Sequence, residues 1–198
     1  CFCTGDGDGK KSDLPLSTRS TRGRALNLGD CLRFNARNFP HKEALVCGNT
    51  RWTFHDLNAR VNSVANGLSK MGVQKGTKAA IMLRNGPEYI EIYYALAKLG
   101  AIAVPLNFML KGRGLAFLIE NSDARFLFLE EDTRKEIEVV GADLNGIRDD
   151  GYVFVGETVP DGYTPYEELA TANEAEEPSV SVGEDEDIII LYSSGTTG

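Results

Sequence analysis

Helical and extended patterns alternate along the chain from residue 26 to residue 140, and this alternation constrains the fold more than any other feature. Apolar residues at three- and four-residue spacing indicate amphipathic helices, whereas short runs of β-branched and aromatic residues indicate strands. Strands that alternate with helices are typical of a parallel sheet, because each helix carries the chain back across the sheet. We therefore predict an α/β fold with strands and helices alternating around a mainly parallel sheet.

Local signals place the individual elements. The clearest helix begins after Thr53, has Asp56 in its first turn and stops at Gly72, where a left-handed terminating residue is expected. A hairpin is expected around Gly48 and Asn49, a dipeptide that tolerates positive φ. The expected helices span about residues 28–39, 53–72, 90–100, 114–120 and 131–140, and the expected strands span 44–47, 51–53, 79–83, 101–104, 125–129 and 188–191.

Two stretches carry too few apolar residues to form a core. Residues 1–24 are polar and glycine-rich and lack the apolar run of a secretory signal, so we expect a disordered tail there and one domain over residues 25–198. Residues 172–187 are acidic and are interpreted as a solvated connector. Four apolar residues follow at 188–191, three of them β-branched, which is typical of a strand buried on both faces.

Charge and cysteine usage exclude several classes of function. The formal net charge of -8 opposes binding to nucleic acid or to an anionic membrane. The longest apolar stretch is far shorter than the roughly 20 residues of a transmembrane helix. The four cysteines (Cys1, Cys3, Cys31 and Cys47) show neither a zinc-ligand spacing nor a disulfide framework. We expect a cytoplasmic protein, with peripheral membrane association left open.

The last seven residues carry the strongest functional signal. They are Tyr192, Ser193, Ser194, Gly195, Thr196, Thr197 and Gly198. Glycines directly after a strand let backbone N–H groups approach anionic oxygens, and the hydroxyls can donate to phosphate or complete a magnesium shell. The run is neither a Walker A loop nor a dinucleotide-binding glycine motif. On these residues alone it fits either an exposed loop or a triphosphate-binding loop.

This run resembles the signature of the adenylate-forming (AMP-binding) superfamily, which reads aromatic, hydroxyl, Ser, Gly, hydroxyl, Thr, Gly, any residue, Pro, Lys. Residues 192–198 match every position they contain, and the final three positions lie beyond Gly198. Further landmarks follow in the family's order, including WTFHDL at 52–57, NGPE at 85–88, AKLGA at 97–101 and VPLN at 104–107. The likeness covers about residues 26–198, is weakest at 131–184, and is most like acyl-CoA synthetases of fatty or aryl acids.

The resemblance implies the N-terminal portion of a large AMP-binding domain, cut within its phosphate-binding loop. It implies a carboxylic acid–CoA ligase that uses ATP, Mg²⁺ and coenzyme A and forms an acyl-adenylate. Residues 193–198 would hold the ATP phosphates, and Thr196 is the candidate for the magnesium shell. The catalytic residues are expected beyond Gly198, so residues 1–198 alone should be inactive. Two alternatives stay open: an amino-acid adenylation domain that loads a carrier protein, and a non-catalytic interaction domain on the same scaffold.

Overall fold

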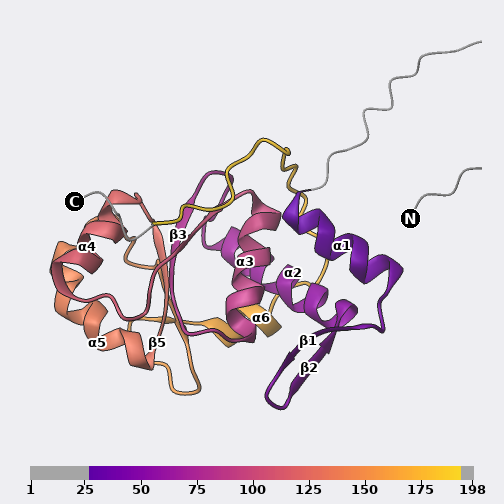
Figure 1. Ribbon diagram of the computed structural model, residues 1–198, viewed down its shortest axis with the longest axis horizontal. Helices are drawn as coiled ribbons and strands as arrows, with labels where there is room; N and C mark the ends of the chain where they lie inside the picture. The colour runs from indigo at the N-terminus through magenta and orange to yellow at the C-terminus, as the bar shows by residue number, and fades with distance from the viewer. Residues whose placement is uncertain (1–26, 193–198) are drawn as a thin grey trace, which may run out of the picture.

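The structure is a computed structural model that describes residues 27–192. The predicted tail at 1–24 and the predicted phosphate-binding residues 193–198 lie outside the described residues. Within 27–192 a five-stranded sheet separates two layers of helices, and a two-stranded hairpin projects from one end (Figure 1). No helix in this part of the chain is long and apolar enough to cross a membrane.

All five strands of the sheet are parallel, in the order β4-β3-β5-β6-β7. In β3, the second strand of this order, Ala79 lies opposite Ala103 on one side and opposite Phe126 on the other. The predicted α/β class with a mainly parallel sheet is therefore confirmed. The strands are β3 (Lys78–Met82), β4 (Ile102–Pro105), β5 (Phe126–Glu130), β6 (Tyr152–Val155) and β7 (Thr164–Pro165).

Each face of the sheet carries its own helices. Alternate residues of a strand point to opposite faces, so Ile81 joins one apolar cluster and Met82 joins the other. The first cluster includes residues of α1 (Leu28–Asn38), α2 (Phe54–Lys70), α3 (Pro87–Leu99) and α6 (Tyr166–Thr171). The second includes residues of α4 (Gly112–Asn121) and α5 (Glu131–Val140), and the short 3-10 helix η1 (Gly141–Asp143) follows α5.

Helix ends follow the local signals in the sequence. Thr53 accepts a hydrogen bond from the Asp56 backbone N–H, and the Asp56 carboxylate accepts one from the Thr53 backbone N–H, which forms a capping box for α2. Pro87 opens α3, and Gly100 closes it at φ 66, a left-handed conformation that favours glycine. The predicted hairpin is also confirmed: β1 (Glu43–Cys47) pairs antiparallel with β2 (Thr50–Thr53).

Two predictions of secondary structure fail in the C-terminal half. Residues 188–191 do not form a strand buried on both faces: Ile189 makes one isolated bridge with Ala103, and Leu191 is 70% exposed. Within the described residues this segment lies at the outer edge of the sheet, with β4 on one side, so residues 188–190 are half-buried and not enclosed on both faces. The second failure is an omission, because β6, β7 and α6 occupy a stretch that we expected to be irregular.

We predict that Gly151→Ala destabilises the protein by about 2 kcal/mol, because overpacking a rigid site carries such a cost. A Cβ at Gly151 would lie 2.5 Å from the Arg125 carbonyl oxygen, and a backbone atom cannot move aside cheaply. Gly141→Ala is the matched control, since a Cβ there meets nothing within 4 Å and the residue already has helical dihedrals. Urea unfolding of both variants measures the difference, and equal stability of the two would contradict the packing.

Candidate functional site

The segment that leads into the predicted phosphate loop enters the sheet beside β4. The Ala103 N–H donates to the Ile188 carbonyl at 3.0 Å, and the Ile190 N–H donates to the Ala103 carbonyl at 2.9 Å. The bridge is parallel, so this segment runs in the same direction as β4. The predicted site residues Ser193, Ser194, Gly195, Thr196, Thr197 and Gly198 follow directly but lie outside the described residues, so their roles remain predictions.

Tyr192, the last described residue, packs against the α4 side of the sheet. Its ring contacts the apolar cluster of α4 and α5, and its hydroxyl donates to Asn121 Oδ1 at 3.0 Å. Asn121 is the last residue of α4, and the chain passes from there to the start of β5. The aromatic residue at the head of the signature therefore anchors the approach to the loop.

The strand order creates a switch point at the carboxyl edge of the sheet. From β3 the chain moves outward to β4, and from β4 it crosses back to β5 on the other side of β3. Ligands in open α/β sheets bind outside the carboxyl ends of the strands at such a point. Here Arg84 follows β3 and Glu130 ends β5, and the Arg84 backbone N–H donates to Glu130 Oε1 at 2.8 Å.

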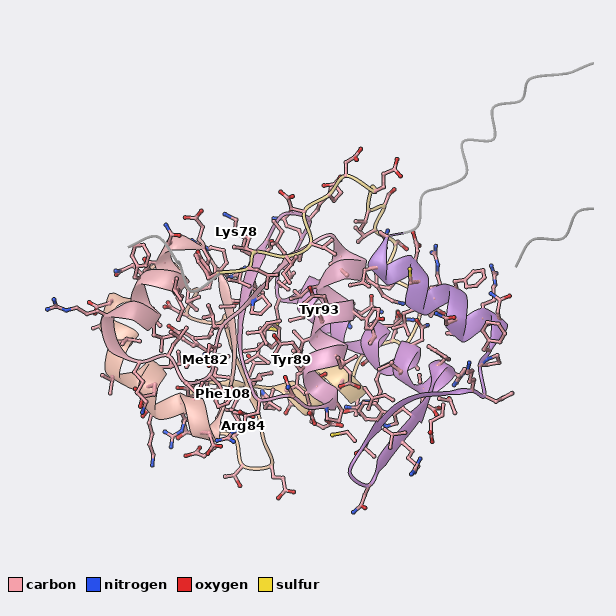
Figure 2. The ribbon with its side chains drawn as sticks, viewed as in Figure 1. Lys78, Met82, Arg84, Tyr89, Tyr93 and Phe108 are labelled. Carbon is pink, nitrogen blue, oxygen red and sulfur yellow. The ribbon has the colours of Figure 1, made fainter. Side chains whose placement is uncertain are left out.

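The Arg84 side chain is held by one group that follows β4 and one group in α5, the helix after β5. Its guanidinium carbon lies 5.1 Å from the ring centroid of Phe108, which follows β4, and its Nε lies 2.8 Å from Asp132 Oδ2. Figure 2 shows Arg84 and Phe108 together at the end of β3 opposite Lys78. The fold thus brings a cation and an aromatic ring together where β3 and β5 end, a pair that the sequence did not single out.

Two open hollows flank the start of α3 near the same edge. One, of about 240 Å³, lies between the hairpin and the turn before α3, where Tyr89 and Ile90 line it. The other, of about 320 Å³, is lined by Glu88, Val155, Gly156, Glu157, Tyr166 and Glu167. The first lining is mainly apolar and the second carries three carboxylates. Near the start of α3, these two hollows leave room for a ligand or a neighbouring segment.

A buried carboxylate lies behind the second hollow. Glu91 on α3 is 0% exposed, forms a close ion pair with Arg60 of α2 and accepts a short hydrogen bond from the Tyr166 hydroxyl. Arg60 also pairs with Glu167 at 3.1 Å and stacks 4.8 Å from the Trp52 ring centroid. Burial raises the pKa of Glu91, while Arg60 and Tyr166 oppose that rise. This network joins β2, α2, α3 and α6.

Three aromatic residues pack against the first apolar cluster. Trp52, Tyr93 and Tyr94 contact the cluster of α1, α2, α3 and α6, and residues 85–86 lead into α3 at Pro87. Cys31 and Cys47 are free and exposed. In the described range 27–192 no three His, Cys, Asp or Glu residues are grouped in a way that could hold a metal ion.

The acidic connector is not a purely solvated segment, which corrects the prediction. Residues 173–187, called the strap below, cross α2 and the end of α3 as the yellow segment of Figure 1. Glu177 pairs with Lys98 at 2.7 Å, and Glu186 pairs with Lys75 at 2.5 Å. Polar residues of α2 also bind strap carbonyls. Charge composition alone could not show this, because the partners are more than 70 residues away.

The fold and the signature define an adenylate-forming α/β enzyme domain, and comparison with known proteins agrees. Residues 32–198 match the family described as AMP-binding enzyme. The chain is 31% identical over 176 residues to the long-chain-fatty-acid–CoA ligase FadD13 of Mycobacterium tuberculosis, covering 87% of this chain and 33% of that protein. It is 35% identical over 177 residues to a feruloyl-CoA synthase of Amycolatopsis sp, covering 88% and 32% respectively. The chain belongs to the AMP-binding enzyme family.

Solved structures show the same likeness. The anthranilate CoA ligase AuaEII, in complex with anthranoyl-AMP, has a TM-score of 0.82 at 26% identity, with 88% of this chain and 33% of that chain covered. The N-terminal domain of FACL13 from Mycobacterium tuberculosis has a TM-score of 0.76 at 30% identity, with 87% and 42% covered. The chain thus spans about a third of the length of the curated relatives cited above.

We predict that Arg60→Met lowers the free energy of unfolding by about 3–5 kcal/mol at neutral pH, because it leaves a buried carboxylate without its ion-pair partner. Arg134→Met is the control, because Arg134 makes exposed pairs with Glu131 and Glu138 and should change stability far less.

The loss in Arg60→Met should depend on pH. A carboxyl with a raised pKa in the folded state favours folding below its ordinary value of 4.5 and costs stability as pH rises through the raised pKa. Removing Arg60 raises that pKa further. The deficit relative to the unsubstituted protein should therefore be smallest below pH 4.5 and grow toward neutral pH in urea titrations. A deficit independent of pH would show that Glu91 is not responsible.

Proposed function

We propose that the protein to which this chain belongs is a carboxylic acid–CoA ligase that works through an acyl-adenylate. The observation that carries the proposal is the run from Tyr192 to Gly198, which completes every signature position it contains and follows the segment bound to β4. The relatives cited above are named as CoA ligases or synthases, which supports coenzyme A as the acyl acceptor. The 33% coverage of the FadD13 relative makes this a proposal for the whole protein.

The reaction has two steps. The carboxylate of the acid attacks the α-phosphorus of ATP, a P–O bond forms, and the bond to the β-phosphate oxygen breaks, so that pyrophosphate leaves. The coenzyme A thiolate then attacks the carbonyl carbon of the mixed anhydride, and AMP leaves with the electron pair of the broken C–O bond. Neither step changes the oxidation state of any atom.

Residues 193–198 have the donors that such a reaction needs. Backbone N–H groups around Gly195 and the hydroxyls of Thr196 and Thr197 would bind the β- and γ-phosphates and orient pyrophosphate as the leaving group. The Thr196 hydroxyl is a hard oxygen donor of the kind that Mg²⁺ accepts. A bound Mg²⁺ would offset the charge that accumulates on the phosphates.

The described residues contribute a scaffold. Tyr192 anchors the start of the loop through Asn121, and β4 fixes the segment before it. Arg84 lies at the switch point, where its guanidinium is paired with Asp132. The relatives named above act, by their names, on fatty, ferulic and anthranilic acids. We accordingly propose a fatty or aryl acid as the substrate class.

The direct test is acid-dependent exchange of labelled pyrophosphate into ATP by the full-length protein, over a panel of fatty, aryl and amino acids. Exchange that requires a fatty or aryl acid, followed by thioester formation with coenzyme A, is the expected result. Exchange with an amino acid and no transfer to free coenzyme A would instead identify a carrier-loading adenylation domain. A folded protein that does not bind ATP would fit a non-catalytic interaction domain. The 198-residue chain alone should show no turnover.

Within the loop, Thr196→Val and Thr197→Val should each lower the exchange rate by about 100-fold, since each removes a donor to the phosphates. The control is Thr171→Val on α6, where the hydroxyl bonds only the local Glu167 carbonyl at 2.7 Å. Exchange rates are compared after circular dichroism confirms that all three variants fold. Full activity in both loop variants would remove the phosphate-binding role of these hydroxyls.

A further inference from the structure

We propose that Lys98 is a positioning residue for the adenylating reaction: by binding Glu177 it holds the strap, which leads through the segment beside β4 to Tyr192, where the predicted phosphate-binding signature begins. The inference rests on the proposed function and adds a residue far from the loop to the machinery of the site. Lys98 lies in the last turn of α3, on the side of the helix that faces α2.

Lys98 uses all three of its ammonium protons in one partly buried cluster. Its Nζ donates to Asn58 Oδ1 at 2.8 Å, to Asn62 Oδ1 at 2.6 Å and to Glu177 Oε2 at 2.7 Å. The Asn58 amide donates in turn to Glu177 Oε1 at 2.8 Å, so Lys98, Asn58 and Glu177 form a closed ring of hydrogen bonds. The Lys98 side chain is only 4% exposed. Such a fully satisfied ring fixes the position of Glu177.

Burial makes this ring dependent on both charges. Burial lowers the pKa of Lys98, and the hydrogen bond to Glu177 opposes that effect. Burial alone would raise the pKa of Glu177, but the bonds from Lys98 and Asn58 outweigh it, so the pKa is lowered. Both groups are therefore held in their charged forms by each other. Loss of Glu177 leaves the buried Lys98 ammonium without an opposite charge, and loss of Lys98 leaves the half-buried Glu177 carboxylate without its charged partner.

The strap has no helix or strand of its own and is held mainly by side chains. Asn62 Nδ2 donates to the Ala175 carbonyl at 2.9 Å, and Asn66 Nδ2 donates to the Glu174 carbonyl at 2.7 Å. Further along, Asn27 Nδ2 donates to the Val182 carbonyl at 3.2 Å. Asn62 thus binds Lys98 with its oxygen and the strap with its nitrogen. The position of the strap consequently depends on the Lys98 cluster.

The strap contacts α3 and β4 at successive points, in the same order along both segments of the chain. Lys98 binds Glu177, the backbone at Gly100 lies against Val182, and Ala103 binds Ile188 and Ile190. A Cβ at Gly100 would come within 3.2 Å of the Val182 side chain, which shows how closely the strap is applied there. Tyr192 follows two residues after Ile190. A strap released at Glu177 would therefore loosen the approach to the loop that binds phosphate.

The competing interpretation gives Lys98 only a packing role between α2 and α3. That role predicts a lower melting temperature and an unchanged KM for ATP in the protein that remains folded. Positioning predicts a raised KM for ATP even when stability is restored. Replacing both partners by apolar residues of similar size removes the stranded charge, so the double variant Lys98→Met with Glu177→Met should regain most of the stability lost by Lys98→Met.

The experiment uses the full-length protein in four forms: unsubstituted, Lys98→Met, the double variant, and Lys78→Met as control. Lys78 pairs with Asp123 at 2.8 Å, and Asp123 lies outside the strap. We expect Lys98→Met and the double variant to raise the KM for ATP by about fivefold, a typical effect of uncoupling a distant contact. The KM for the acid should stay nearly constant. Hydrogen exchange should increase in residues 173–187, and Lys78→Met should show neither change.

Each outcome decides between the interpretations. A double variant with restored melting temperature and an unchanged KM for ATP overturns the positioning role, as does unchanged hydrogen exchange in the strap. If the unsubstituted protein binds ATP but shows no acid-dependent exchange, the proposed ligase function fails separately, and the ATP dissociation constants of the four forms then test the positioning role. A protein that does not bind ATP overturns both. If Lys98→Met does not fold, the KM for ATP of the double variant is compared with that of the unsubstituted protein.

Discussion

The burial of β3 on both faces is the constraint on which the rest of the structure depends. Ala79, Ala80, Ile81 and Met82 are all 0% exposed, and hydrogen bonds join the strand to β4 on one side and to β5 on the other. A strand enclosed in this way can only be covered by two helical layers, which the connections through α3 and α4 provide. The same enclosure fixes the carboxyl end of β3, so Arg84 has a defined place beside Glu130.

Charged residues of helix α3 that are buried by this enclosure need partners from other elements. It is packed between the sheet and α2, and it buries both Glu91 and Lys98. Each charge is satisfied by groups from α2: Arg60 for Glu91, and Asn58 and Asn62 for Lys98. Each also binds a residue from after β6, namely Tyr166 or Glu177. Buried charges thus specify how the late segments of the chain return to the early helices.

Family membership and this architecture together assign a supporting role to the described residues. The described residues form a scaffold that leads into the predicted phosphate-binding residues, and several side-chain hydrogen bonds hold the strap on that path. Such a path needs side-chain anchors because the strap offers little apolar surface for packing. Its acidic residues are therefore partly structural, which explains why an exposed-looking composition can still be ordered.

The sequence by itself determined the elements whose signals are local. The capping residues Thr53 and Asp56, the left-handed Gly100 and the alternating patterns fixed the helices and strands up to residue 140, and the run from Tyr192 fixed the family. Only the tertiary structure decided the rest. The four-residue β6 is a strand because it pairs with β5, and segment 188–191 lies at an edge of the sheet. Lys98 binds Glu177, which is 79 positions away in the sequence. Pairing and burial depend on distant neighbours, and no local pattern encodes them.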